Sequence, residues 1–239
     1  MVGVQRILRT AARAAASSAA FALLAGSSVF AQERHRDPHG MYQPLNQSAP
    51  PGRTAHWFAA AGRIHPIEQQ TVRVVLPSSG KVTFFTVDPA NPIEVDAPGM
   101  VALKLGHVYR LRIAAMPEFP GIELYPSVEL IDRLHPPPGQ EERFPVPIEF
   151  TEEEIEAALD GRMVTKVVYL EQPQLAALRD DDPFIPVQDV SNTINLFAEA
   201  DLRGRPLVIV RLGSRLPDPV APGTAFFGTG REVLVPRGR

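Results

Sequence analysis

Proline is spread densely through this chain, and it restricts the folds that the chain can adopt. The 239 residues include 25 prolines. Proline interrupts helices and, within sheets, is confined to edges, bulges and turns. A loop-rich, mainly β protein is therefore favoured over a helical one. The chain has no cysteine, which excludes disulfides, thiolate metal sites, haem attachment and a cysteine nucleophile, so packing alone must stabilise the fold.

The first 31 residues have the pattern of a bacterial secretory signal peptide. Residues 1–13 carry three arginines and no acidic residue, and a small, apolar run follows at 14–26. The segment ending at Ala31 fits the small-x-small cleavage pattern, so we expect cleavage before Gln32. The apolar run is shorter than the roughly 20 residues of a membrane span. We predict an exported protein, periplasmic, at the cell surface or extracellular, with no membrane span.

Charge narrows the class of partner. The formal net charge is −3, and it becomes −6 when the three leader arginines are removed. A mildly acidic surface has no basic excess for nucleic acid or an anionic membrane. The partner expected is an unknown protein or a component of the cell envelope.

Strand patterns indicate a sandwich domain with appendages. We expect a signal peptide at 1–31, a polar, proline-containing disordered arm at 32–57, a β-sandwich domain with flanking helices at 58–215 and a C-terminal tail at 216–239. In the tail, Phe226 and Phe227 are expected to pack onto the domain. Apolar and polar residues alternate in most of the segments expected as strands, which are 70–76, 82–86, 93–95, 109–113, 122–130, 146–150, 163–170 and 207–212.

Two of these segments carry finer predictions. The turn Pro77-Ser78-Ser79-Gly80 lies between 70–76 and 82–86, which predicts a hairpin. Pro126 falls on the apolar face of 122–130, which predicts an edge strand or a bulge because proline cannot donate to a ladder. Glu123, Ser127 and Glu129 are expected on the opposite, solvated face.

A short motif indicates the type of sandwich. Leu103, Gly106 and Tyr109 have the L-x-x-G-x-x-Y spacing. This spacing resembles the tyrosine corner of immunoglobulin-like and fibronectin-type sandwiches, whose tyrosine bonds backbone a few residues upstream. The resemblance implies an antiparallel, immunoglobulin-like β-sandwich in which Tyr109 is structural.

Two short helices are expected on one flank. Thr151-Glu152-Glu153-Glu154 is a capping box that begins a helix, whose buried face is Ile155, Ala158 and Leu159 and which Gly161 ends. A second helix is expected at 196–203, before Gly204. The segments 156–162 and 199–205 agree at five of seven positions. We interpret this match as convergence on the needs of a helix end rather than as a repeat.

Three stretches together resemble a family of secreted bacterial proteins of planctomycete type that has no assigned activity. The stretches are 106–113 with 119–126, 131–139 through 150–154, and 164–171 with 204–213. The resemblance covers residues 101–217. It implies an exported domain and no catalytic residues.

The remaining constellations give weak chemical signals. His35 and His39 lie in the expected arm, and the six histidines are scattered. Asp180-Asp181-Asp182 suits a hard cation such as calcium, but an acidic solvated loop is the expected role. Nucleophile and phosphate-loop motifs are absent, and Gly228-Thr229-Gly230 lacks a following helix and a lysine.

Carboxylates and aromatic residues leave two alternatives open. A carboxylate pair such as Glu123 and Glu129 would suit glycoside hydrolysis. Trp57, Phe119 and Tyr125 would suit a sugar platform, although burial is the expected role of such aromatics.

We therefore predict an exported, non-enzymatic binding or structural module with no cofactor and no assigned catalytic or metal-binding residue. The alternatives are a hydrolase that uses dispersed carboxylates and a calcium-stabilised surface protein.

Overall fold

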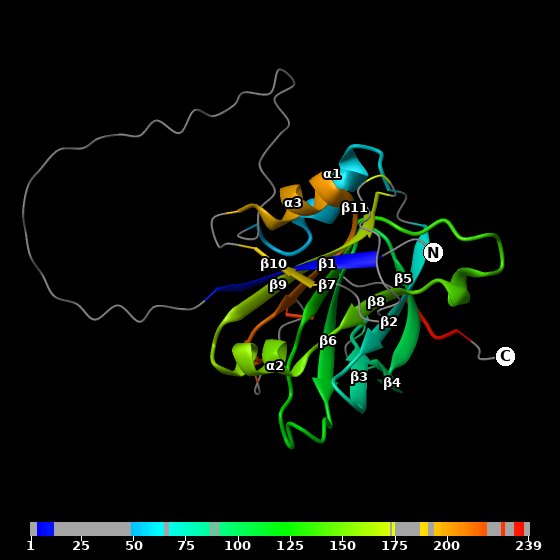
Figure 1. The fold of residues 1–239 in the computed structure, drawn as a ribbon. Coiled ribbons are helices and arrows are strands. Elements are labelled where there is room, and N and C mark those ends of the chain that lie inside the picture. Colours follow the sequence, from blue (N-terminus) through cyan, green and yellow to red (C-terminus); the bar gives the residue numbers. More distant parts are fainter. Residues whose placement is uncertain are drawn as a thin grey trace, which may run out of the picture. The chain divides into compact units, whose positions relative to one another are not determined.

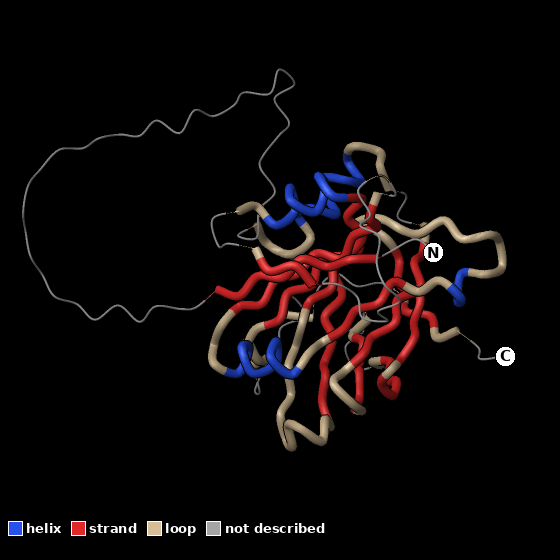
Figure 2. The backbone as a smooth tube through the Cα atoms, in the orientation of Figure 1, coloured by secondary structure: helices blue, strands red, loops and turns tan. Residues whose placement is uncertain are grey.

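The computed structural model describes residues 4–11, 49–64, 67–86, 88, 91–172, 174, 187–190, 194–218, 226–227 and 232–236. Strands dominate this part of the chain (Figures 1 and 2). The mainly β prediction is therefore confirmed.

The strands form two sheets. One has the order β10-β1-β9-β11-β7-β6-β3-β4 and the other the order β12-β5-β2-β8. Neighbours run antiparallel except in the parallel pairs β1–β10 and β2–β8. The strands are β1 (Val4–Ala11), β2 (Gln69–Val75), β3 (Gly80–Phe84), β4 (Ile93–Ala97), β5 (Gly99–Lys104), β6 (Val108–Ala114), β7 (Ser127–Leu130), β8 (Val146–Glu149), β9 (Met163–Glu171), β10 (Val187–Asp189), β11 (Gly204–Leu212) and β12 (Val233–Leu234).

Three α-helices are described where the sequence predicted two. They are α1 (Arg53–Ala60), α2 (Glu152–Leu159) and α3 (Leu196–Arg203), with a short 3-10 helix, η1, at Glu141–Arg143. Helix α2 contacts β9 and β11, and α3 contacts β1, β9 and β11. Helices α2 and α3 thus both pack on β9 and β11, whereas α1 contacts β7 through the Ala55–Glu129 bond and α3 through the Phe58–Phe197 rings.

Both sheets contribute side chains to one continuous apolar core. In β6, the residues that face the core are fully buried, namely Tyr109, Leu111 and Ile113. The residues between them, Arg110 and Arg112, are partly exposed. The alternation predicted there is confirmed. The Tyr109 hydroxyl accepts a hydrogen bond from the Lys104 N–H at 2.9 Å and donates to the Lys104 carbonyl at 3.3 Å. The predicted bond of Tyr109 to upstream backbone is therefore confirmed too.

The predicted hairpin between 70–76 and 82–86 is wrong. β2 pairs with β5 and β8, whereas β3 pairs with β4 and β6 in the other sheet. Both strands bury alternate residues in the shared core, so both show the period-two pattern. Alternation identifies the buried face of a strand and leaves its neighbour undetermined.

The prediction of an edge strand or bulge at Pro126 is also wrong. β7 begins at Ser127, one residue after the proline, and lies between β11 and β6. The expected solvated face is wrong for Ser127 and Glu129, which are 2% and 0% exposed. Helix α1 lies over the face expected in solvent, where its Ala55 N–H donates to Glu129.

The limits of the arm and the tail differ from the prediction. α1 begins at Arg53, inside the expected arm 32–57, and buries Thr54 and Ala55. The arm up to residue 48 lies outside the described residues. In the tail, Phe226 and Phe227 are buried as predicted, but Val233–Leu234 also adds a strand beside β5.

Helix ends were predicted well. Thr151 and Glu154 form the reciprocal capping box of α2, Gly161 has φ +79°, and α3 has the predicted bounds. Leu159 is an exception, with 41% exposure. Ala157 takes its place in the core because the buried face of α2 is rotated toward it.

The N-terminal segment gives an unexpected result. Val4–Ala11, within the predicted signal peptide, forms β1 between β9 and β10, and residues 12–31 lie outside the described part. Cleavage before Gln32 stays a prediction. None of the described helices has the length and apolar character of a membrane span.

Candidate functional site

The candidate site is the hydrogen-bonding edge of β9 along which β1 pairs. β9 pairs along its length with β11 on one side, and with β1 on the other. The residues 164–169 are all at least 96% buried in the chain that contains β1. With β11 paired along one edge and β1 along the other, β9 is a central strand of its sheet.

The pairing of β1 with β9 is long and regular. Eight consecutive residues pair antiparallel, from Val4 with Leu170 to Ala11 with Met163. On its other side β1 runs parallel to β10, from Arg6 with Val187 to Leu8 with Asp189. The geometry is that of one strand inserted between two others.

A buried ion pair joins β9 to α2. The Lys166 ammonium lies 2.6 Å from a Glu154 carboxylate oxygen, and both side chains are at most 2% exposed. Lys166 also donates to the Glu149 carbonyl and lies 4.7 Å from the centre of the Phe150 ring. The positive charge of Lys166 is thus compensated by Glu154 inside the protein. This ion pair holds the start of α2 against β9.

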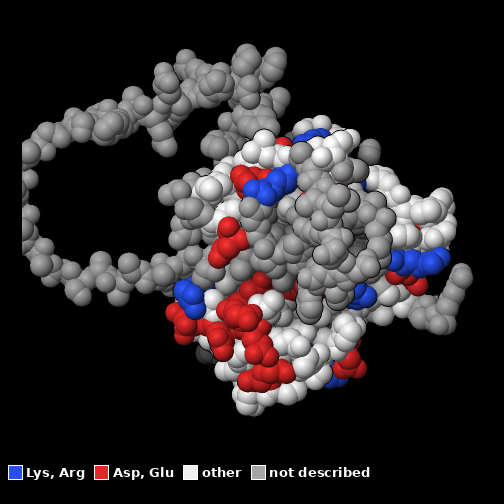
Figure 3. Space-filling model, viewed as in Figure 1, with Lys and Arg blue, Asp and Glu red and all other residues white. Residues whose placement is uncertain are grey.

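The outer face of α2 is acidic. Figure 3 shows carboxylates gathered over this helix, where Glu152, Glu153, Glu156 and Asp160 are exposed. The pKa of Glu153 is lowered because its own backbone N–H and the Thr151 hydroxyl hydrogen-bond to the carboxylate. The charged form is therefore favoured at the N-terminus of this helix.

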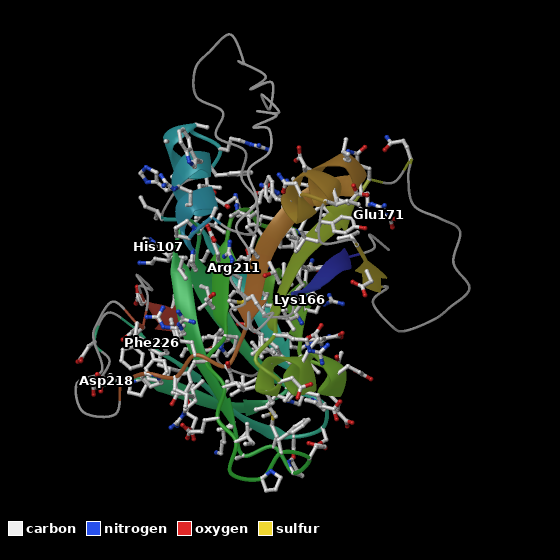
Figure 4. The ribbon with its side chains drawn as sticks, turned by 90° about the vertical axis from the view of Figure 1, so that its left-hand side faces the viewer. His107, Lys166, Glu171, Arg211, Asp218 and Phe226 are labelled. Atoms are coloured by element: carbon white, nitrogen blue, oxygen red, sulfur yellow. The ribbon has the colours of Figure 1, made fainter. Side chains whose placement is uncertain are left out.

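Two further acids lie beside β1, which occupies the position between β9 and β10. Asp189 of β10 is exposed and pairs in register with Leu8. Glu171 is half-buried at the end of β9, and Figure 4 shows it near α3. Negative charge therefore lies just beyond the Val4 end of β1 and along the side of β1 that pairs with β10.

A second buried ion pair lies on the neighbouring strand β11, on which Figure 4 labels Arg211. Arg211 is 3.1 Å from Glu129, whose side chain is 0% exposed. The other Glu129 oxygen accepts the Ala55 N–H at 2.8 Å. Because the N-cap Gly52 provides no side-chain bond, this carboxylate caps α1 from another part of the chain.

The acids that the sequence offered for hydrolysis are not brought together. Glu129 pairs in register with Val108, at the start of β6, whereas Leu124, next to Glu123, bridges to Ile113 near its end. Glu123 contacts Arg112 at 3.4 Å, and Glu129 contacts Arg211. Each carboxylate is therefore neutralised by its own arginine.

The aromatic residues considered for a sugar platform do not form one. Tyr125 is buried against Phe226 and Phe227, Phe119 packs on the main core, and Trp57 is half-buried on α1. Burial, and the hydrogen bond that Tyr125 donates to Glu123, raise the pKa of Tyr125 to about 12. This cluster fastens the tail, as Arg110 also does by donating to the Phe226 carbonyl.

The candidate metal residues mostly lie outside the described residues, which include neither Asp180–Asp182 nor His35, His39 and His65, nor the glycine-rich Gly228–Gly230. His56 and His135 are exposed, and His107 is half-buried. Within the described ranges, no three His, Asp or Glu side chains are grouped closely enough to hold a metal ion.

Sequence reasoning missed the edge of β9 as a site. The signal was the run Val164-Thr165-Lys166-Val167-Val168, in which valines occupy both faces beside one threonine and one lysine. Such a run predicts a strand that is buried on both of its faces. It does not identify the segment that provides the second neighbour.

Comparisons with known proteins add no relative. No family model matches the chain, and neither the curated proteins nor the solved structures gave a match.

Proposed function

We propose that the protein is an exported, non-enzymatic binding module that binds its partner through the edge of β9. One observation carries this proposal: the neighbour of β9 on that side is Val4–Ala11, which belongs to the leader expected to be removed. Cleavage after Ala31 takes β1 away and leaves backbone N–H and C=O groups of β9 without a strand. Such an edge is a template for a strand from another chain.

The composition of β9 supports a binding role. Natural sheet edges are usually protected by proline, a bulge, short length or exposed charge. β9 has nine residues and no proline, and its central charge, Lys166, is buried against Glu154. An edge with none of these protections requires an occupant.

We also propose that the two sheets form an immunoglobulin-like sandwich and that the chain belongs to the secreted bacterial family that it resembles. The Tyr109 bond to Lys104 and the core shared by both sheets support the first statement. The motifs within 101–217 support the second.

The test combines the N-terminus with hydrogen exchange. Mass spectrometry of the protein from the export compartment is expected to find Gln32 first. In an antiparallel strand, alternate residues bond to opposite neighbours. Every second amide of β9 should therefore exchange quickly in the mature protein, while the others stay protected by β11. An uncleaved chain made by cell-free translation without membranes should protect them all.

Two results would contradict the proposal. One is a mature protein that keeps Met1. The other is a cleaved protein that unfolds, as judged by circular dichroism, while the uncleaved chain folds, because β1 would then be a permanent part of the domain.

A further inference from the structure

We infer that the β9 edge accepts a cationic, extended segment of a partner protein, antiparallel to β9, and that residues 4–11 hold this place until the leader is removed. The inference rests on the proposed function, because the edge must be opened by cleavage. The inference specifies the charge and direction of the partner segment that pairs with β9, called the guest strand below. It also gives a reason why binding begins only after export.

Backbone geometry sets the length and direction of the guest. β1 pairs with β9 over eight consecutive residues with no register shift, and it reaches β10 on its other side. A guest in the same place forms main-chain hydrogen bonds along both of its edges. Those bonds give affinity with little dependence on side chains, as in other cases of strand addition.

Charge sets the chemistry of the guest. Asp189 lies on β10, Glu171 ends β9, and the exposed carboxylates of α2 lie on a helix that packs against β9; Arg162, which follows this helix, is paired with Asp160 at 3.2 Å. The segment that occupies the place, Val4–Ala11, contains Arg6 and Arg9 and no acid. A basic strand is therefore attracted where an acidic one is repelled, over a range of about 8–10 Å at moderate salt.

The same charges disfavour a second copy as the guest. Antiparallel pairing of two β9 edges would bring two acidic α2 helices and two Glu171 side chains to one interface. Like charges that face each other across an interface oppose association. The mature formal charge of −6 acts in the same direction.

The leader acts as a tethered competitor. A linked segment has an effective concentration that reaches the millimolar range for short flexible linkers. A free peptide with micromolar affinity therefore competes poorly until the tether is cut. Cleavage would thus couple export to the opening of the binding edge.

The experiment uses a fluorescent peptide with the sequence of residues 2–13 as the probe. Its binding is measured by anisotropy to the exported protein, whose N-terminus has been shown to be Gln32, and to the uncleaved chain. One control peptide carries Ile7→Pro, which removes a main-chain donor. A second carries Arg6→Glu with Arg9→Glu, which reverses the charge.

Two protein variants test the acidic surroundings. The first combines Glu152→Gln, Glu156→Gln and Asp189→Asn, all exposed: the first two lie on α2, which packs against β9, and the third lies on β10, which pairs with β1. The matched control combines Glu118→Gln, Glu141→Gln and Glu142→Gln, which are also exposed but lie on the β6–β7 loop and at η1.

The mature protein is expected to bind the peptide at least about tenfold more tightly than the uncleaved chain. Binding should restore slow exchange at alternate amides of β9. Ile7→Pro should weaken binding by about tenfold or more. The first protein variant should lose about three- to tenfold in affinity at low salt and little at high salt, and the matched control should lose nothing.

The remaining outcomes overturn the inference in distinguishable ways. Fast exchange of alternate β9 amides with no peptide binding would support an open β9 edge but would contradict a cationic partner strand. If the charge-reversed peptide bound as tightly as the unmodified peptide, the requirement for a cationic partner strand would also be contradicted. Full protection of β9 in a mature dimer would assign the edge to a second copy. Full protection in a mature monomer would mean that the chain closes its own edge, and it would overturn the proposed function too.

Discussion

The units α2–β9 and α3–β11 have similar sequences at their junctions and different structural roles. Both contain the pattern Glu-Ala-x-Leu-x-Gly-Arg, and β9 and β11 are paired with each other. β11 has β7 on its other side, whereas β9 has only the N-terminal segment described there. A similar junction thus leads into a strand paired with β7 in one unit and, in the other, into a strand paired with the segment that we propose is removed on export.

The two glycines of the shared pattern show that the match is local. Gly161 has φ +79°, and a Cβ there would meet nothing within 4 Å. Gly204 is extended, with φ −176°, and a Cβ there would lie 2.1 Å from the Leu170 carbonyl oxygen. The first glycine is needed for a left-handed turn and the second for close approach of two strands, which agrees with convergence.

The largest predicted effects come from the two buried ion pairs. Glu129→Ala and Glu154→Ala each leave a buried cation without its carboxylate, and each should lower the free energy of unfolding by about 3–5 kcal/mol in the uncleaved chain. If the leader is removed as proposed, the β9 edge beside Lys166 opens to water, so the cost of Glu154→Ala should fall while that of Glu129→Ala stays unchanged. Urea denaturation of both forms measures this difference. Equal responses to cleavage would show that β9 and β11 do not differ in exposure.

The glycines come next. Gly204→Ala should destabilise the protein by about 3 kcal/mol, the upper part of the range for overpacking, because the β9 backbone must move. Gly161→Ala should cost about 1–2 kcal/mol, the penalty for a left-handed residue with a Cβ.

Substitution by asparagine distinguishes a left-handed backbone, the cause at Gly161, from close packing of two strands, the cause at Gly204. Asparagine tolerates the left-handed conformation but adds bulk. Gly161→Asn should recover most of the loss, and Gly204→Asn should recover none. Equal costs for both asparagine variants in thermal unfolding would contradict the distinction.

Local features of this fold were predictable from sequence, and pairings between distant segments were not. Thr151, Gly161 and Tyr109 act on backbone within about five residues, so local spacing predicted the cap and the end of α2, and the tyrosine-corner resemblance predicted the Tyr109 bond. The hairpin at Pro77–Gly80 failed because β2 and β3 bury residues in the same core from different sheets. Glu129 was assigned to solvent because its partner, Arg211, lies 82 residues away.

The candidate site was the least predictable part for the same reason. The apolar run in β9 indicated a strand covered on both faces, but its neighbour β1 is the segment Val4–Ala11, far from β9 in the sequence. The arginines of that segment were interpreted as a targeting signal, and a targeting signal gives no reason to expect strand pairing.

The helix caps should give smaller effects. Thr151→Ala removes the acceptor for the Glu154 N–H, and Asn195→Ala removes the acceptor for the Phe197 and Ala198 N–H groups. Each substitution should cost about 1 kcal/mol, and Thr151→Ser or Asn195→Asp much less. Amide exchange should rise at Glu154 in the first variant and at Phe197 and Ala198 in the second. A loss of protection throughout both helices would mean that the caps hold whole helices rather than single turns.

The smallest predicted effect is a titration that separates the two caps. The pKa of Glu153 is lowered from 4.5, first by its own backbone N–H and then by the Thr151 hydroxyl. A lowered pKa in the folded state means that the unfolded state binds the proton more tightly. The contribution of Glu153 to stability is therefore present above about pH 4.5 and is lost as the pH falls through the lowered pKa. Thr151→Ala removes one of the two hydrogen bonds and should raise the pKa of Glu153 toward its ordinary value, whereas Asn195→Ala should leave it unchanged. Carbon-13 NMR of the side-chain carboxyl follows this titration directly. An equal rise in both variants would mean that the pKa of Glu153 responds to overall stability rather than to the capping hydroxyl, and the local role assigned to Thr151 would fail.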